Sequence, residues 1–359
     1  MPVMPLIGTD PFLLKQQPGQ SVQPVFWGRI SDSVSFSGNT QPSAEKTSSE
    51  YNPREYNMVQ MLRGERVKIA WREFGNPNAK NVVVCMHGYT RNSHDFDKLA
   101  EQLAGKNCRV ICPDVVGRGN SGWFRSPAKA MKYEFSTYVS QMQQLFRHLK
   151  LGDKNITWVG TSMGGIVGMK MAVLPDTPIR RLVLNDIGPR ISADAVDYLS
   201  ELFRDEEAAV FESVDEAVPY FKARMAGAGK LSNAAWQKLA EDSLRYDAKQ
   251  GVYKLDYDPA ITEGFRWGNR INLLVNPFHR AMIATFLSSD LRNIWQHVGV
   301  PVLLLHGEDS RVLDSKTVQG MQKDRDNITV LDFPGVGHAP ALVSTQEVKA
   351  IRDWIKANS

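Results

Sequence analysis

The stretch WVGTSMGGIVG, residues 158–168, joins an apolar run to a turn that is dense in glycine. With its neighbours it reads NITWVGTSMGGIVGMKMAV, a pattern that predicts a strand, a sharp turn and a helix running to about Leu174. Ser162 would then project from the turn at the carboxyl end of the strand, where open α/β sheets bind ligands. The spacing G-x-S-x-G is too common to show by itself whether Ser162 is an activated nucleophile. The rest of the chain must supply its partners.

Short apolar runs bounded by turns recur on both sides of this stretch, as expected for strands that are buried on both faces. They cover residues 82–86, 109–111, 156–159, 182–184, 302–305 and 328–331. Helical patterns separate them, most clearly over 135–149, and a further one covers 345–357. A hairpin is predicted around Gly64. Strands that alternate with helices predict a mostly parallel sheet with helices on both faces.

The alternation divides the chain into three parts. Residues 1–55 are rich in Pro, Gly, Ser, Thr and Gln and predict an extended or partly disordered arm. Residues 56–190 and 298–359 form the α/β core. Between them, residues 191–297 show helical patterns, over 193–203, 214–225 and 233–246 among others, and predict a helical insertion over one edge of the sheet.

Composition restricts the class of protein. The 43 basic and 39 acidic residues give a net charge of +4 without long charged runs, which argues against a nucleic-acid partner. No apolar run is long enough to span a membrane, and the N-terminus lacks the pattern of a signal peptide, so we expect a cytoplasmic protein. Cys85, Cys108 and Cys112 lie in strand-like runs and are expected to be buried free thiols, not a disulfide framework or a zinc site.

A serine is a poor nucleophile without a base. The segment DFPGVGHAPALV places His338 in a glycine-rich loop between the last strand-like run and the last helix, from which it could reach Ser162. The segment VVVCMHGYTRNSHDF leaves a strand through His87, Gly88 and Tyr89. We expect the backbone N–H groups of Tyr89 and Met163 to hold an oxyanion, and His87 to brace the loop by hydrogen bonds.

Together these motifs resemble the α/β-hydrolase superfamily over about residues 57–190 and 298–357. The resemblance rests on His87-Gly88, PDVVGRGNSG (113–122), the turn at Ser162, LVLNDIGP (182–189) and GVGHAP (335–340). It implies an α/β-hydrolase fold in which 191–297 form a helical cap over the active site. It also implies a catalytic serine, acid and histidine in that chain order, with Ser162 as nucleophile and His338 as base.

The acid departs from the usual pattern of the superfamily, in which it follows the strand before the last in a G-x-x-D turn. Here LLLHGEDSRVLD places Ser310 at that position and Asp309 one residue earlier. Asp186 stands at the end of the strand that follows the nucleophile's helix, although it can equally be a turn residue. We favour Asp186 and keep Asp309 as the alternative acid.

The predicted chemistry is hydrolysis of a small-molecule carboxylic ester through an acyl-enzyme, with no metal or organic cofactor implied. A serine at the turn argues against the relatives that use an aspartate nucleophile. A carbon–carbon bond hydrolase, lactonase, thioesterase or amidase remains possible on this scaffold, as does a noncatalytic binding protein. Aromatic residues of the cap are expected mostly in its core, with some lining an apolar acyl pocket: Phe203, Phe211, Tyr220, Phe221, Trp236, Tyr246, Tyr253, Tyr257, Phe265 and Trp267.

Overall fold

A mostly parallel eight-stranded sheet is the central element of the protein. A computed structural model describes residues 53–204, 209–263 and 291–359, and the strands in it follow the order β1-β2-β4-β3-β5-β6-β10-β11. The strands are β1 (Arg54–Leu62), β2 (Glu65–Gly75), β3 (Asn81–Met86), β4 (Cys108–Pro113), β5 (Asn155–Thr161), β6 (Ile179–Asn185), β10 (Val302–Gly307) and β11 (Ile328–Phe333). All neighbours from β4 to β11 run parallel, whereas β1, β2 and β4 pair antiparallel. The predicted fold class is therefore confirmed.

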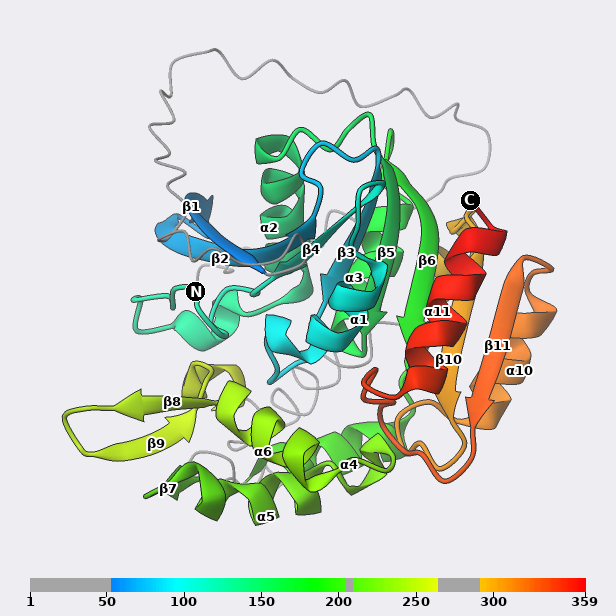
Figure 1. Ribbon diagram of the computed structural model, residues 1–359. Coiled ribbons are helices and arrows are strands. Elements are labelled where there is room, and N and C mark those ends of the chain that lie inside the picture. Colours follow the sequence, from blue (N-terminus) through cyan, green and yellow to red (C-terminus); the bar gives the residue numbers. More distant parts are fainter. Residues whose placement is uncertain (1–52, 205–208, 264–290) are drawn as a thin grey trace, which may run out of the picture. The chain divides into compact units, whose positions relative to one another are not determined.

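Helices cover both faces of this sheet (Figure 1). On one face α1 (Asp97–Leu103) contacts α11 (Thr345–Ala357), and on the other α2 (Phe135–His148) contacts α3 (Met163–Ala172). Every residue of α3 is buried, because this helix also contacts α9 (Arg292–His297) and the strands β5 and β6. A further helix, α10 (Ser315–Lys323), connects β10 to β11. No described helix is long and apolar enough to span a membrane.

The inserted segment lies at the carboxyl ends of the parallel strands (Figure 1). It contains three expected helices, namely α4 (Ala193–Arg204), α5 (Val214–Arg224) and α6 (Asn233–Asp242). The predicted helical insertion is not wholly helical, because β7 (Val210–Phe211), β8 (Leu244–Asp247) and β9 (Val252–Leu255) form a three-stranded antiparallel sheet. The helix predicted over 233–246 ends at Asp242, since Tyr246 pairs with Tyr253 across a hairpin.

Two smaller expectations are also settled by the structure. Arg54 and Glu55, assigned to the N-terminal arm, belong to β1, and the arm itself lies outside the described residues up to position 52. The three cysteines are free thiols; Cys85 and Cys112 are buried, whereas Cys108 is only partly so.

The turn after β5 packs directly against the end of β3. A Cβ atom on Gly164, in the first turn of α3, would lie 2.0 Å from the backbone oxygen of Met86. Glycine is therefore required here for close approach of the helix to the sheet.

Gly164→Ala should lower the free energy of unfolding by ~1–3 kcal/mol or more, because α3 must shift away from β3. Gly152→Ala is the matched control, since a Cβ atom there meets nothing within 4 Å. Urea titrations of both variants measure the difference. Equal midpoints would show that the helix does not need this approach.

Candidate active site

Ser162 occupies a strained turn between β5 and α3. Its φ of +50° and ψ of −114° lie outside the regions that L-residues ordinarily adopt. The Ser162 N–H donates to the carbonyl of Asn185 at 3.0 Å, and the indole of Trp158 donates to the carbonyl of Gly164 at 2.9 Å. These bonds fix the turn from both sides, so the serine hydroxyl projects beyond the carboxyl end of β5.

Asp186 directly follows β6, the strand beside β5, and is fully buried. Its backbone is also left-handed, with φ of +54°. Its carboxylate accepts three hydrogen bonds, from the N–H of Gly307 at 3.0 Å, the hydroxyl of Ser310 at 2.6 Å and Nδ1 of His338 at 2.7 Å. A buried carboxylate is tolerated where donors surround it in this way.

Ser310 is a site residue whose contribution the sequence pattern does not reveal. It stands where the superfamily usually has its acid, and its hydroxyl donates to Asp186. The same oxygen accepts the backbone N–H groups of Val312 at 3.2 Å and Leu313 at 3.0 Å. Because those donors occupy its lone pairs, the hydroxyl hydrogen is directed at the carboxylate.

His338 joins Asp186 to Ser162. Its Nε2 lies 3.0 Å from Oγ of Ser162. An ionised Asp186 can only accept a hydrogen bond, so Nδ1 carries the ring hydrogen and Nε2 is left to accept the serine hydroxyl. The loop that carries His338 is tied to the sheet through Asn185, whose side chain donates to the carbonyl of Pro340 at 2.9 Å.

Asp309 has a different environment from Asp186. It is exposed, and its backbone N–H donates to the carbonyl of Val336 at 2.9 Å. The structure therefore brings Asp186, and not Asp309, into hydrogen bonding with the ring of His338.

The two residues expected to hold an oxyanion flank Ser162. Met163 is the first residue of α3, and the N–H groups of a helix's first turn have no acceptor within the helix. Tyr89 lies in the loop after β3, and a Cβ atom on the preceding Gly88 would stand 3.9 Å from the Cβ of Ser162. The Tyr89 hydroxyl donates to the carbonyl of Ile261 in the inserted segment at 2.7 Å.

His87 braces this loop. Its Nε2 accepts the backbone N–H of Val115 at 3.0 Å, so Nδ1 carries the hydrogen and donates to the carbonyl of Gly88 at 2.8 Å. The ring is fully buried, and this burial lowers its pKa from 6.5 to about 3. His87 is thus a neutral structural histidine at neutral pH.

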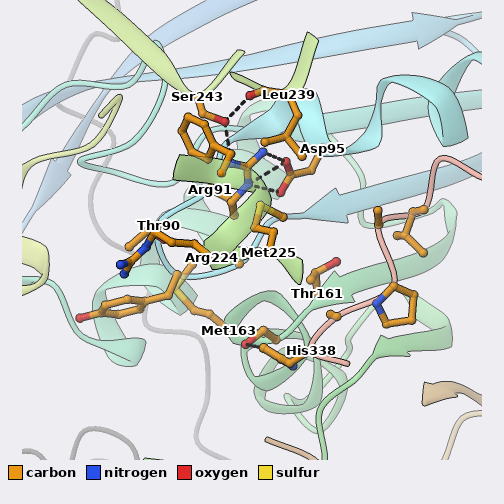
Figure 2. A pocket seen from close by; sticks show the side chains of 18 of the residues that line it. Thr90, Arg91, Asp95, Thr161, Met163, Arg224, Met225, Leu239, Ser243 and His338 are labelled. Atoms are coloured by element: carbon orange, nitrogen blue, oxygen red, sulfur yellow. Dashed lines mark hydrogen bonds and ion pairs between the residues drawn. The ribbon is translucent and has the colours of Figure 1, made fainter. Parts of the chain in front are cut away.

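A cavity of about 510 Å³ opens onto these residues. Figure 2 shows Met163 and His338 at one end of it and Arg91, bonded to Asp95 and Ser243, at the other. Much of the wall is apolar and comes from α3, the loop after β6 and the insertion: Ile166, Ile187, Ile191, Leu199, Leu202, Phe203, Tyr220, Phe221, Met225 and Tyr257. Of the other aromatic residues predicted for this segment, Phe211, Trp236 and Tyr253 pack in the core of the insertion, Tyr246 is exposed, and Phe265 and Trp267 lie outside the described residues.

One group of side chains in the described part of the chain has the composition of a metal site. Ligand atoms of His94, Asp97 and Asp242 lie within 4.8 Å of one another. Nδ1 of His94 is hydrogen-bonded to Asp97 at 3.1 Å and lies 3.6 Å from Asp242. These contacts account for the cluster as a polar link between α1 and the insertion.

Comparison with known proteins assigns the family. The model of the alpha/beta hydrolase fold family matches residues 81–345, so the chain belongs to this family. A putative hydrolase from Rickettsia typhi has a similar solved structure, with a TM-score of 0.72 and 29% identity over 86% of this chain and 100% of that one.

Two relatives of known activity are similar to this chain over most of its length. The chain is 33% identical to a 3-hydroxybutyrate-oligomer hydrolase of Cupriavidus necator, over 78% of this chain and 90% of the relative. It is 26% identical to a 2-(acetamidomethylene)succinate hydrolase of Mesorhizobium japonicum, over 77% of this chain and 88% of that protein. Both relatives are hydrolases by name.

The buried His87 makes stability depend on pH. The unfolded chain protonates this histidine near pH 6.5, whereas the folded protein keeps it neutral down to about pH 3. Between these values the unfolded state binds more protons, so stability falls as the pH is lowered. In His87→Gln, which lacks this titration, the melting temperature should fall less steeply from pH 7 to pH 4.

His297→Gln, at an exposed histidine, is the control for the histidine-to-glutamine substitution itself. Differential scanning calorimetry at matched ionic strength measures all three proteins. Parallel curves for the wild type and His87→Gln would contradict the assignment of a neutral buried ring.

Proposed function

We propose that the protein hydrolyses carboxylic esters by acyl transfer to Ser162, with His338 as general base and Asp186 as the triad acid. The observation that carries the proposal is the continuous hydrogen-bonded series in which Ser162 Oγ lies 3.0 Å from His338 Nε2 and His338 Nδ1 lies 2.7 Å from Asp186. This series opens onto the cavity of about 510 Å³. Membership in a family of hydrolases supports the same reading.

The proposed reaction has two halves. Oγ of Ser162 attacks the ester carbonyl carbon while Nε2 of His338 takes the hydroxyl proton, and Asp186 stabilises the resulting imidazolium. The negative charge that develops on the carbonyl oxygen is held by the N–H groups of Tyr89 and Met163. The tetrahedral intermediate collapses as His338 gives its proton to the leaving alcohol. Water, deprotonated by His338, then releases the acid and restores Ser162.

We further propose that the substrate is an ester of a short hydroxy acid. The support is the relationship at 33% identity to a 3-hydroxybutyrate-oligomer hydrolase and the mixed lining of the cavity. Its apolar residues, such as Ile187 and Leu199, suit small alkyl branches. The polar residues Thr90 and Arg224 line the same cavity and suit ester oxygens and a terminal carboxylate.

The substrate proposal predicts a rank order of turnover. Dimers and trimers of 3-hydroxybutyrate should have a higher kcat/KM than long-chain p-nitrophenyl esters, because Thr90 and Arg224 in the cavity wall suit the ester oxygens and terminal carboxylate of such oligomers, which a long alkyl chain lacks. The same panel should include the matched amide and a vinylogous diketone. Cleavage of the diketone with no ester hydrolysis would replace the proposal with carbon–carbon bond hydrolysis.

The nucleophile is tested by covalent labelling. A fluorophosphonate should modify Ser162 alone, as located by peptide mass spectrometry, and Ser162→Ala should lose both labelling and turnover. Ser315→Ala, at an exposed serine that begins α10, is the matched control and should keep both. An active Ser162→Ala variant would refute the mechanism.

The acid is tested by a pair of variants. Asp186→Asn keeps the shape but removes the charge that stabilises the imidazolium, so kcat should fall at least ~100-fold, about 2.7 kcal/mol of barrier. Asp309→Asn should lose less than ~10-fold in kcat, because Asp309 is exposed and does not contact His338. Both are measured at saturating ester, with circular dichroism to verify folding. A reversed pattern would assign the acid to Asp309.

A further inference from the structure

The motif PDVVGRGNSG places a buried cation behind the candidate active site. Arg118 lies in the loop after β4 and is fully inaccessible to solvent. Three tyrosine rings surround its guanidinium, with its central carbon 5.3 Å from the ring centre of Tyr89, 5.6 Å from that of Tyr133 and 4.9 Å from that of Tyr138. Such cation–π contacts lower the cost of burying a charge.

The guanidinium contacts both residues of the candidate oxyanion site. Its Nε donates to the backbone carbonyl of Tyr89 at 2.9 Å. Its Nη2 points to Met163, where the acceptor is the thioether sulfur at 3.9 Å, and a thioether is a weak acceptor. Its Nη1 donates to the carbonyl of Val116 and the hydroxyl of Tyr138, both at 2.9 Å. One side of a buried cation therefore faces the start of α3.

No carboxylate in the described segments of the chain forms an ion pair with Arg118. Within these segments a carboxylate approaches it through Tyr133, which donates its hydroxyl to the buried Asp258 at 2.7 Å, and Lys129 already pairs with that carboxylate at 2.9 Å. A buried arginine without a direct counter-ion is costly to the folded state. Its positive potential is weakly screened and extends to nearby groups.

We propose that Arg118 is a positioning residue for the oxyanion site. Its hydrogen bond holds the carbonyl of Tyr89, in the peptide unit that follows the one carrying the Tyr89 N–H, and so restrains the loop at that residue. Its charge favours the anion that forms between the Tyr89 and Met163 N–H groups. The inference rests on the proposed function, since it requires an oxyanion at that place. A residue that acts in this way stabilises the transition state more than the bound ester.

The alternative is that Arg118 only holds the loop in place, and kinetics separate the two roles. Arg118→Met should lower kcat about 30- to 100-fold with a KM change below about 3-fold, a smaller loss than that expected for a deleted oxyanion donor. Arg118→Lys, which keeps the charge but not the fork of donors, should recover part of this loss. Tyr138→Phe removes a single acceptor of the guanidinium and should cost a few fold, so it tests the idea even if Arg118→Met does not fold.

Inhibitor affinity separates the two roles, because a less stable loop would weaken the binding of charged and neutral inhibitors alike. A trifluoromethyl ketone forms a charged tetrahedral adduct with Ser162, whereas an isosteric amide binds as a neutral ground-state analogue. Across the variants, affinity for the ketone should fall in parallel with kcat/KM while affinity for the amide stays within about 3-fold. The amount of folded protein is set by circular dichroism.

Arg109→Met is the matched control. Arg109 is also buried and pairs with Glu73 at the edge of β2 and β4, away from the cavity. It should lower the melting temperature while kcat per folded molecule is unchanged.

The outcomes are distinct. Folded Arg118 variants with wild-type kcat, or with equal losses of ketone and amide affinity, would overturn the role of Arg118 and leave ester hydrolysis intact. A wild-type protein without ester turnover or Ser162 labelling would overturn the proposed function and this inference together.

Discussion

The left-handed backbone at Ser162 is the constraint on which the site depends. The chain must leave β5 and enter α3 within one residue, and the hydrogen bond from the Ser162 N–H to Asn185 stabilises this turn. Gly164 makes it possible, because any side chain there would collide with Met86 in β3. The same turn directs the serine hydroxyl outward and places the first N–H groups of α3 beside it. Backbone geometry at one residue thus positions both the proposed nucleophile and one of the two proposed oxyanion donors.

The hydrogen bonds around Asp186 show how the proposed triad acid is accommodated after a different strand from the usual one. It follows β6, which places its carboxylate next to the turn, while the loop after β10 contributes a donor from Ser310 and another from the Gly307 N–H. Ser310 stands at the position where the superfamily usually has its acid. Here its hydroxyl donates a hydrogen bond to the carboxylate of Asp186. Arg118 adds a further set of contacts around the site, because its guanidinium links the loop after β4 to both Tyr89 and Met163.

Sequence periodicity predicted the core well, since strands such as β3 and β5 are buried on both faces and α2 repeats its apolar residues every three to four positions. It failed at Tyr246, where a helical pattern continues into β8, because cross-strand pairing with Tyr253 overrides local propensity. The partners of Ser162 followed from motifs, but the donor role of Ser310 and the contacts of Arg118 did not. Those depend on loops brought together only by the fold, and no spacing along the chain encodes them.

The central claim is that Ser162 carries the acyl group between two half-reactions. Rapid-quench mass spectrometry of the intact protein with a p-nitrophenyl ester tests it directly. We predict a species heavier by the acyl group, located on the peptide that contains Ser162, which forms with the burst of p-nitrophenol and decays at the turnover rate. Steady turnover without that species, under conditions where the burst reaches the enzyme concentration, or the same adduct on another residue, would contradict the account.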